Sequence, residues 1–123
     1  MKLNLDCIRD ILFEVEEKPL TYPLLVENTA SRLDVYDSAT ILYHIDQCIM
    51  NEYFNKPKRY KGPSYQLRDL SPKGHQFLST IRDDSNWNKT KEIAKSVGST
   101  SLSAIAQIAT GVISSVIQKT FGL

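Results

Sequence analysis

A short run of cations around one aromatic residue is the stretch of this sequence with the clearest chemical meaning. Its members are Lys56, Lys58, Arg59, Tyr60 and Lys61. Lysine and arginine side chains donate charged hydrogen bonds to phosphate oxygens. Because the formal net charge of the whole chain is only +1, affinity for nucleic acid has to come from such a local concentration of charge. The run predicts a phosphate-binding surface, and a solvated charged loop is the alternative.

A second group of polar side chains lies just ahead of this run, in a segment of helical periodicity at about 38–52. Its hydroxyl, imidazole and amide groups suit hydrogen bonds to base edges, and they belong to Thr40, Tyr43, His44, Gln47 and Asn51. The same region holds Asp37, Asp46 and Glu52 but no lysine or arginine, and phosphate repels such a helix. Two interpretations follow, a DNA-reading face and a solvated polar face.

Few residues could carry catalysis or hold a metal. The sequence has no glycine-rich phosphate loop and no nucleophile signature. His44 and Cys48 are one helical turn apart, but two ligands on one helix are too few for a structural zinc site. Asp83 and Asp84 are adjacent, which suits charges at a helix end better than an acid–base pair. We therefore expect no enzyme, no metal and no cofactor.

The basic run has strand-forming residues on both sides, so it is expected on a β-hairpin. The positions that predict the first strand, the tip and the second strand are Tyr53 and Phe54, then Gly62 and Pro63, then Tyr65, Leu67 and Leu70. Cations on such a hairpin can follow a phosphate backbone or enter a minor groove.

Three helices are predicted ahead of the hairpin. The first begins near Asn4 or Asp6 and ends near Glu17, the second covers 23–33, and the third follows a cap at Asp37 or Ser38. Apolar stripes at helical spacing are expected to face the core in the first and third helices, through Ile8, Ile11, Leu12 and Val15, and through Ile41, Leu42, Ile45 and Ile49.

Three further helices are predicted after the hairpin, the last two of them C-terminal to the winged core and the final one within residues 99–123. Ser71 caps one of them, Pro72 occupies its first turn, and Gly74 permits a close backbone approach to the hairpin. The helical pattern breaks at 83–86, and the next helix begins at Ser85 or Asn86 and ends at Gly98.

This order of elements is typical of a winged helix-turn-helix domain. The predicted fold is α+β, mainly helical with a small hairpin, with the winged domain over residues 1–82. Residues 83–123 form a C-terminal helical extension for dimerisation or docking. At 123 residues and 41% hydrophobic content, the chain is sized for one such domain with an added element.

The tail at 99–123 has a long apolar stripe that must be covered. The stripe includes Leu102, Ile105, Ala109, Val112, Ile113 and Val116. Its serine, threonine and glutamine residues argue against membrane insertion, so no membrane partner is expected. We expect this helix to pair with its copy in a homodimer, and docking within its own chain is the alternative.

The two cysteines indicate the compartment. Cys7 and Cys48 lie within apolar helical patterns, and no charged segment followed by an apolar one opens the chain. We therefore expect a reduced cytoplasmic protein with buried thiols.

Several phrases together resemble an uncharacterised family of small proteins found in Gram-positive bacteria and their phages and prophages. They are DCIRDIL at 6–12, ILYHI at 41–45, LSPKGHQFL at 70–78, and IRDD at 81–84 with Trp87, Thr90 and Lys91. The phrase LSPKG is also similar to the segment after the wing in winged-helix transcription regulators, and this resemblance implies DNA binding.

Two functions are compatible with the sequence. The first is a dimeric DNA-binding regulator associated with a phage or prophage, with double-stranded DNA as its ligand. The second is a winged-helix interaction module that binds and modulates a host protein without contacting DNA. The acidic helix at 38–52 and the near-neutral charge favour the second, whereas the basic hairpin favours the first.

Overall fold

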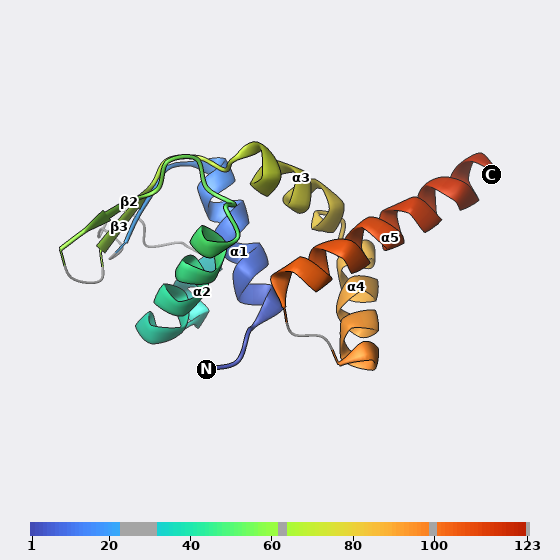
Figure 1. Ribbon diagram of the computed structural model, residues 1–123, viewed down its shortest axis with the longest axis horizontal. Helices are drawn as coiled ribbons and strands as arrows, with labels where there is room; N and C mark the ends of the chain where they lie inside the picture. Colours follow the sequence, from blue (N-terminus) through green and yellow to red (C-terminus); the bar gives the residue numbers. More distant parts are fainter. Residues whose placement is uncertain (23–31, 62–63, 99–100, 123) are drawn as a thin grey trace. The chain divides into compact units, whose positions relative to one another are not determined.

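The computed structural model describes residues 1–22, 32–61, 64–98 and 101–122, and Figure 1 traces the chain. The chain folds into two compact units, Met1–His75 and Gln76–Leu123. Within the described residues the fold is mainly helical with a small antiparallel sheet, so the predicted α+β class is confirmed. Most of the helix predicted at 23–33 lies outside the described residues, as do Gly62 and Pro63, the predicted hairpin tip.

The first unit contains the sheet and the helices around it. In chain order its elements are α1 (Leu5–Glu17), β1 (Leu20–Tyr22), the 3-10 helix η2 (Arg32–Val35), α2 (Ser38–Met50), β2 (Lys58–Tyr60), β3 (Ser64–Leu67) and the start of α3 (Pro72–Ile81). The side chain of Asn4 accepts a hydrogen bond from the backbone N–H of Cys7, and that of Asp37 accepts one from Thr40. These caps satisfy backbone groups that a helix N-terminus leaves unpaired, and both were predicted.

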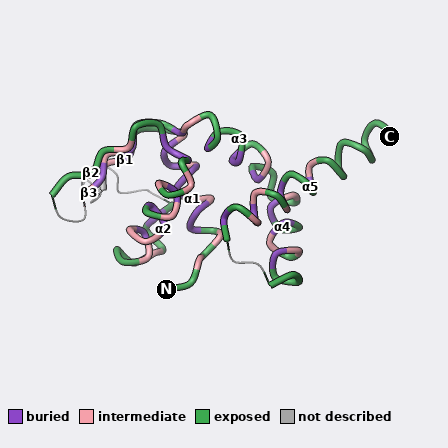
Figure 2. Tube along the Cα trace, in the orientation of Figure 1, coloured by how far each residue is buried: buried purple, intermediate pink, exposed green. Residues whose placement is uncertain are grey.

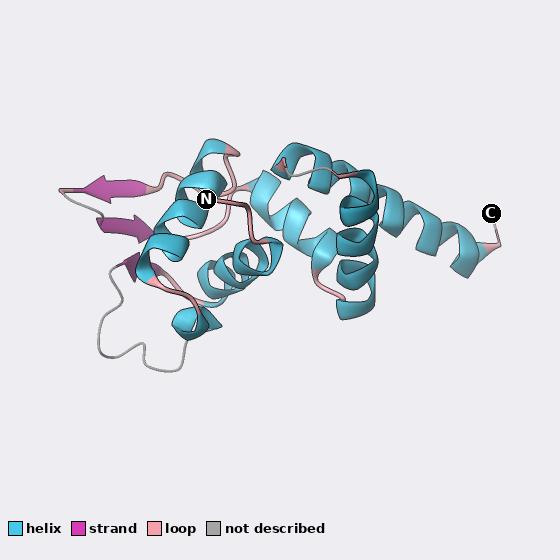
Figure 3. Ribbon diagram, turned by 90° about the horizontal axis from the view of Figure 1, so that it is seen from below, coloured by secondary structure: helices cyan, strands magenta, loops and turns pink. Residues whose placement is uncertain are grey.

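The sheet has three strands in the order β1-β3-β2, all antiparallel (Figure 3). The strand β1, in which Leu20 pairs with Leu67, was not predicted. The first hairpin strand begins at Lys58, so its predicted start at Tyr53 was wrong. Phe54 forms only an isolated bridge to Leu70, and Lys56 has a φ of 48°, which interrupts extended backbone between the bridge and the strand.

The core of this unit forms where α1 packs on α2. The predicted α1 stripe is buried throughout, as are Ile41 and Ile45 of α2. Leu42 and Ile49 are only half-buried, so the predicted apolar face of α2 was partly wrong. The position between Ile41 and Cys48 on the buried face is taken by His44, a polar residue.

Both cysteines are free and buried, as expected. Burial is the main cause that raises the pKa of Cys7 to about 12, and it also raises the pKa of Cys48. Since the thiolate is the reactive form, neither thiol should react with a disulfide reagent in the native protein at pH 8, and both should react after denaturation. Fast labelling of either thiol in the native protein would contradict this burial.

The start of α3 is fixed by a close contact with the segment after α2. Ser71 donates its backbone N–H to the carbonyl of Tyr53 at 2.9 Å and its hydroxyl to the carbonyl of Glu52 at 2.6 Å. The Ser71 hydroxyl oxygen also accepts from the N–H of Gly74, which confirms the predicted cap. A β-carbon added to Gly74 would lie 2.1 Å from the Tyr53 carbonyl oxygen. The close backbone approach predicted for Gly74 is therefore confirmed.

The second unit contains the rest of α3, α4 (Asp84–Val97) and α5 (Leu102–Phe121). Asp83 caps α4 by accepting from the N–H of Asn86, so the predicted cap at Ser85 or Asn86 was wrong. Gly98 ends the helix with a φ of 72°, as predicted. Helices α4 and α5 pack against each other.

Burial changes along α5. Four residues of the predicted dimer stripe are covered within the chain: Leu102, Ile105, Ala109 and Val112. Figure 2 shows the last turns of α5 as exposed, and there Val116 is 40% and Phe121 72% accessible. Ile113 is half-buried between these regions. The first half of α5 therefore follows the alternative of docking within its own chain, and only the second half has an apolar surface free for a partner.

Candidate nucleic-acid interface

The predicted phosphate-binding residues lie together on the β2/β3 hairpin. All of them are exposed: Lys56, Lys58, Arg59, Tyr60 and Lys61. We call the four cations of this set the basic hairpin patch. Tyr60 is 52% accessible and donates its hydroxyl hydrogen to the side-chain oxygen of Gln66 at 3.0 Å. Since β2 is at the edge of the sheet, the patch is open along one whole strand.

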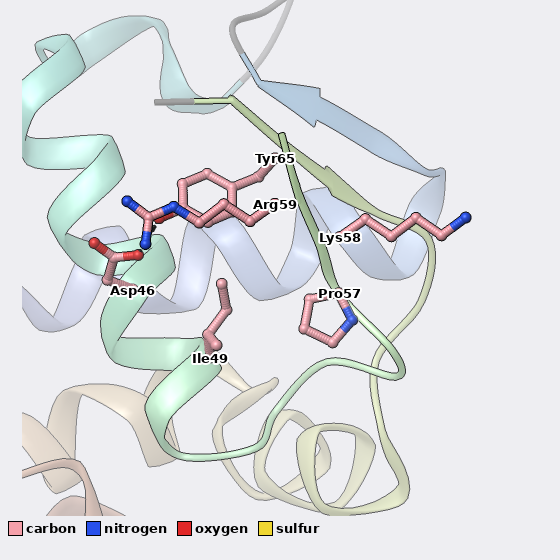
Figure 4. A pocket seen from close by; sticks show the side chains of 6 residues that line it. All are labelled: Asp46, Ile49, Pro57, Lys58, Arg59 and Tyr65. Atoms are coloured by element: carbon pink, nitrogen blue, oxygen red, sulfur yellow. Dashed lines mark hydrogen bonds between the residues drawn. The ribbon is translucent and has the colours of Figure 1, made fainter. Parts of the chain in front are cut away.

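The side chains of β2 alternate between the two faces of the hairpin. Figure 4 shows Lys58 and Arg59 pointing in opposite directions. Arg59 pairs in register with Tyr65, and its guanidinium carbon lies 5.8 Å from the centre of the Tyr65 ring. Tyr65 donates its hydroxyl hydrogen to Asp46 of α2. Burial, and then this hydrogen bond, raise the pKa of Tyr65. Arg59 is thus held on the side that faces α2, and Lys58 on the other.

A small open hollow of about 130 Å³ lies between α2 and the hairpin (Figure 4). It is lined by Asp46, Ile49, Pro57, Lys58, Arg59 and Tyr65. Its surface is mostly apolar, with the two cations and the single carboxylate around it. The sequence gives no direct signal for it, because its residues come from a helix and from both sides of the hairpin.

The residues predicted to read bases do not form the exposed face of α2. Thr40, His44, Gln47 and Asn51 follow one another at intervals of four, three and four residues, so they make one strip of the helix. His44, in the middle of this strip, is fully buried. Its Nε2 accepts from the backbone N–H of Asn4, and its Nδ1 donates to the carbonyl of Thr40, both at 2.7 Å. His44 was therefore wrongly expected to reach DNA.

The other four predicted readers are only partly accessible. Asn51 donates its side-chain amide to the backbone carbonyl of Gln47 at 2.8 Å, so one of its donors is used at the end of α2. Thr40, Tyr43 and Gln47 are half-buried. The structure places Thr40, Gln47 and Asn51 on one strip of α2 away from its most exposed face, and Tyr43 beside that face.

The face of α2 that does point to solvent is apolar with a single carboxylate. It contains Ala39, Asp46 and Met50, which are exposed, with Leu42, Tyr43 and Ile49 half-buried beside them. We call these six residues the outward strip. Met50 is 66% accessible. Only Asp46 and the Tyr43 hydroxyl offer polar groups there, and the strip has no cation.

A structural role for His44 predicts a loss of stability when it is removed. We expect His44→Ala to lower the free energy of unfolding by about 2–4 kcal/mol, because it leaves the Asn4 N–H unpaired and opens a cavity. Gln47→Ala, in the same strip but half-buried, is the control and should change stability by about 0.5 kcal/mol or less. Denaturation in urea measures both. An unchanged stability of His44→Ala would contradict the structural role.

Two further features bear on the type of site. Among the described residues, none of the helices combines the length and hydropathy needed to span a lipid bilayer. In the same part of the chain, no three His, Cys, Asp or Glu side chains are grouped in a way that could hold a metal ion.

Comparison with known proteins places the chain in a family without giving it an activity. The family model described as hypothetical protein (DUF2513) matches residues 2–101. An uncharacterized protein of Haemophilus influenzae is 32% identical over an alignment of 127 residues. The alignment covers 93% of this chain and 97% of that protein. No solved structure matches the chain. With its family model matched from residue 2 to residue 101 and a relative similar over nearly its full length, the chain belongs to the DUF2513 family.

Proposed function

We propose that this protein is a winged-helix DNA-binding protein of the cytoplasm, a small regulator of transcription associated with a phage or prophage. The element order of the first unit supports the winged-helix assignment. The helices α1 and α2 precede the hairpin, α3 follows it, and β1 pairs with the second hairpin strand. An antiparallel sheet in the order β1-β3-β2 is the arrangement expected when a hairpin forms a wing beside the third helix of such a domain.

The observation that carries the proposal is the basic hairpin patch. Four exposed cations lie within six residues of a chain with a formal net charge of +1. Phosphate contacts supply most of the sequence-independent affinity of DNA-binding proteins. A patch of this density on an edge strand can follow a phosphate backbone without hindrance from a neighbouring strand.

The salt dependence of binding tests the proposal. Fluorescence anisotropy of a labelled random duplex, titrated with the full chain over a salt series, should give a log-log slope of about −3.6 for four phosphate contacts. No binding at low salt would overturn the proposal. A slope near zero would show that the patch does not hold phosphates.

A second candidate function is protein recognition without DNA, as a module that binds a host protein. The outward strip of α2 favours it, because that strip offers apolar groups and a carboxylate where a DNA-reading helix offers donors and cations. In this case the basic hairpin patch would pair with acidic residues of the partner.

We further propose a homodimer through the second half of α5. This helix has 20 residues and α4 has 14, so α5 is about 9 Å longer, and Val116, Ile117 and Phe121 are exposed on it. Light scattering should give about twice the monomer mass of 14.0 kDa. Val116→Glu should give monomer, whereas Gln107→Glu, on the polar face of α5, should not. A full-length chain of monomer mass would overturn the dimer.

A further inference from the structure

The outward strip of α2 is a mostly apolar surface with the cation Arg59 beside it. A segment with an apolar face and acidic residues next to that face would complement it. We propose that the strip and the adjacent cation Arg59 dock an acidic amphipathic segment of a partner protein. This proposal rests on the second candidate function, protein recognition, and specifies the chemistry of the partner. If the protein also binds DNA, the same surface would let the partner regulate that binding.

The apolar part of the surface has the pattern that binds an amphipathic helix. Ala39, Tyr43 and Met50 share one line along α2, in which the carboxylate Asp46 lies between Tyr43 and Met50. Leu42 and Ile49 extend the line on one side, and Ile49 lines the hollow beside the hairpin. Helices that recognise such surfaces place apolar side chains at i, i+3, i+4 and i+7 into them. The hollow gives one of these side chains a site to enter.

The charges select an acidic partner. Lys58 and Arg59 both line the hollow and are exposed, but only Arg59 points toward α2, whereas the Lys58 side chain points away from it (Figure 4). The opposing charge, Asp46, already accepts a hydrogen bond from Tyr65, and Arg59 lies over the same Tyr65 ring. Glutamate or aspartate residues beside the apolar face of a bound segment would meet Arg59 and, further along the hairpin, Lys56 and Lys61. Such complementarity raises the rate of association and selects among partners.

The major groove of DNA and a second copy of this chain fit the strip less well. Base edges call for hydrogen-bond donors and for side chains that tolerate nearby phosphate, whereas the strip exposes Met50 and Asp46. The apolar segment that the chain itself could offer is α5. It contains no aspartate or glutamate, so it lacks the charge that the hairpin would pair with.

Docking has a consequence for DNA binding if the proposed function is correct. The bound segment would occupy Arg59, which belongs to the basic hairpin patch, so partner and duplex would compete. An acidic protein segment would then release the regulator from DNA.

A designed peptide tests the docking without DNA. The probe is a helical peptide of about 16 residues with leucine on one face and glutamate on the other. Its counterpart has lysine in place of every glutamate. Amide chemical shifts of the full-length protein, labelled with nitrogen-15, report where and how tightly each peptide binds. The matched variants are Met50→Glu, on the outward strip, and Val35→Glu, which is 81% accessible and lies in η2.

The expected result is shifts confined to α2 and the hairpin, with a Kd on the order of 100 μM. Met50→Glu should weaken binding at least tenfold and Val35→Glu less than twofold. The proposal is overturned by an absence of shifts at about 1 mM peptide, by shifts elsewhere, or by equal binding of the lysine peptide.

A labelled duplex is then added to separate the two functions. Displacement by the glutamate peptide supports the shared surface. A duplex that never binds refutes the DNA proposal and leaves the docking result intact.

Discussion

Replacement of all four cations of the basic hairpin patch by alanine is expected to abolish binding to a DNA duplex. The variant combines Lys56→Ala, Lys58→Ala, Arg59→Ala and Lys61→Ala. At 0.1 M salt, the loss of four phosphate contacts should lower the affinity on the order of a thousandfold, and the salt slope should fall from about −3.6 to near zero. Anisotropy over the salt series used for the native protein measures both quantities. The side chains are exposed, so the fold should be unaffected.

A second variant separates the position of these charges from their number. Lys18, Lys89, Lys95 and Lys119 are exposed and belong to segments of the chain other than the hairpin, and their replacement by alanine also removes four positive charges. We expect this control to bind the duplex within about threefold of the native affinity, because none of the four lysines belongs to the basic hairpin patch and exposed charges outside a binding site are largely screened at 0.1 M salt. Equal losses in the two variants would mean that net charge alone, and not a site, governs binding.

Gly74→Ala is expected to have the largest effect on stability of any single methyl group added to the chain. The new β-carbon would lie 2.1 Å from the carbonyl oxygen of Tyr53, and the contact is with backbone, which cannot rotate away. To relieve the overlap, α3 would have to separate from residue 53, where the Ser71 hydrogen bond joins them. A loss of about 3 kcal/mol or more in the free energy of unfolding follows, and calorimetry or urea denaturation measures it.

Gly111→Ala is the matched control. Gly111 is exposed in the middle of α5, and a β-carbon there would meet nothing within 4 Å. Because alanine is the better helix former, this variant should gain about 0.5–1 kcal/mol. If Gly74→Ala raised the free energy of unfolding as Gly111→Ala is expected to do, helix propensity would outweigh the contact with Tyr53, and the predicted overlap would be contradicted.

The helix boundaries were predictable because they depend on neighbouring residues. Asn4, Asp37 and Ser71 each accept a hydrogen bond from a backbone N–H three residues later, and Gly98 adopts a left-handed conformation that suits glycine. Each of these signals is complete within a few residues of sequence. The cap of α4 was misplaced by two or three residues because Asp83, Ser85 and Asn86 are all acceptable caps.

The rotation of α2 about its axis was not predictable in the same way. Amphipathic periodicity favoured an exposed strip with His44 and a buried one with Leu42 and Ile49. The observed rotation depends on Asn4, 40 residues earlier in the chain, whose N–H satisfies the buried ring of His44. A polar side chain can be buried at little cost when both its polar atoms are paired. The bond from Tyr65 to Asp46 and the three-residue strand β1 escaped prediction for the same reason, since their partners are distant in sequence.

The edge position of β2 gives its cations a second physical role. A strand whose outer backbone groups are unpaired can join the same strand of another molecule, and such pairing leads to aggregation. Lysine and arginine on an edge strand oppose it, because two copies would bring like charges together. Lys58 and Arg59 therefore keep the protein dispersed whatever ligand they bind.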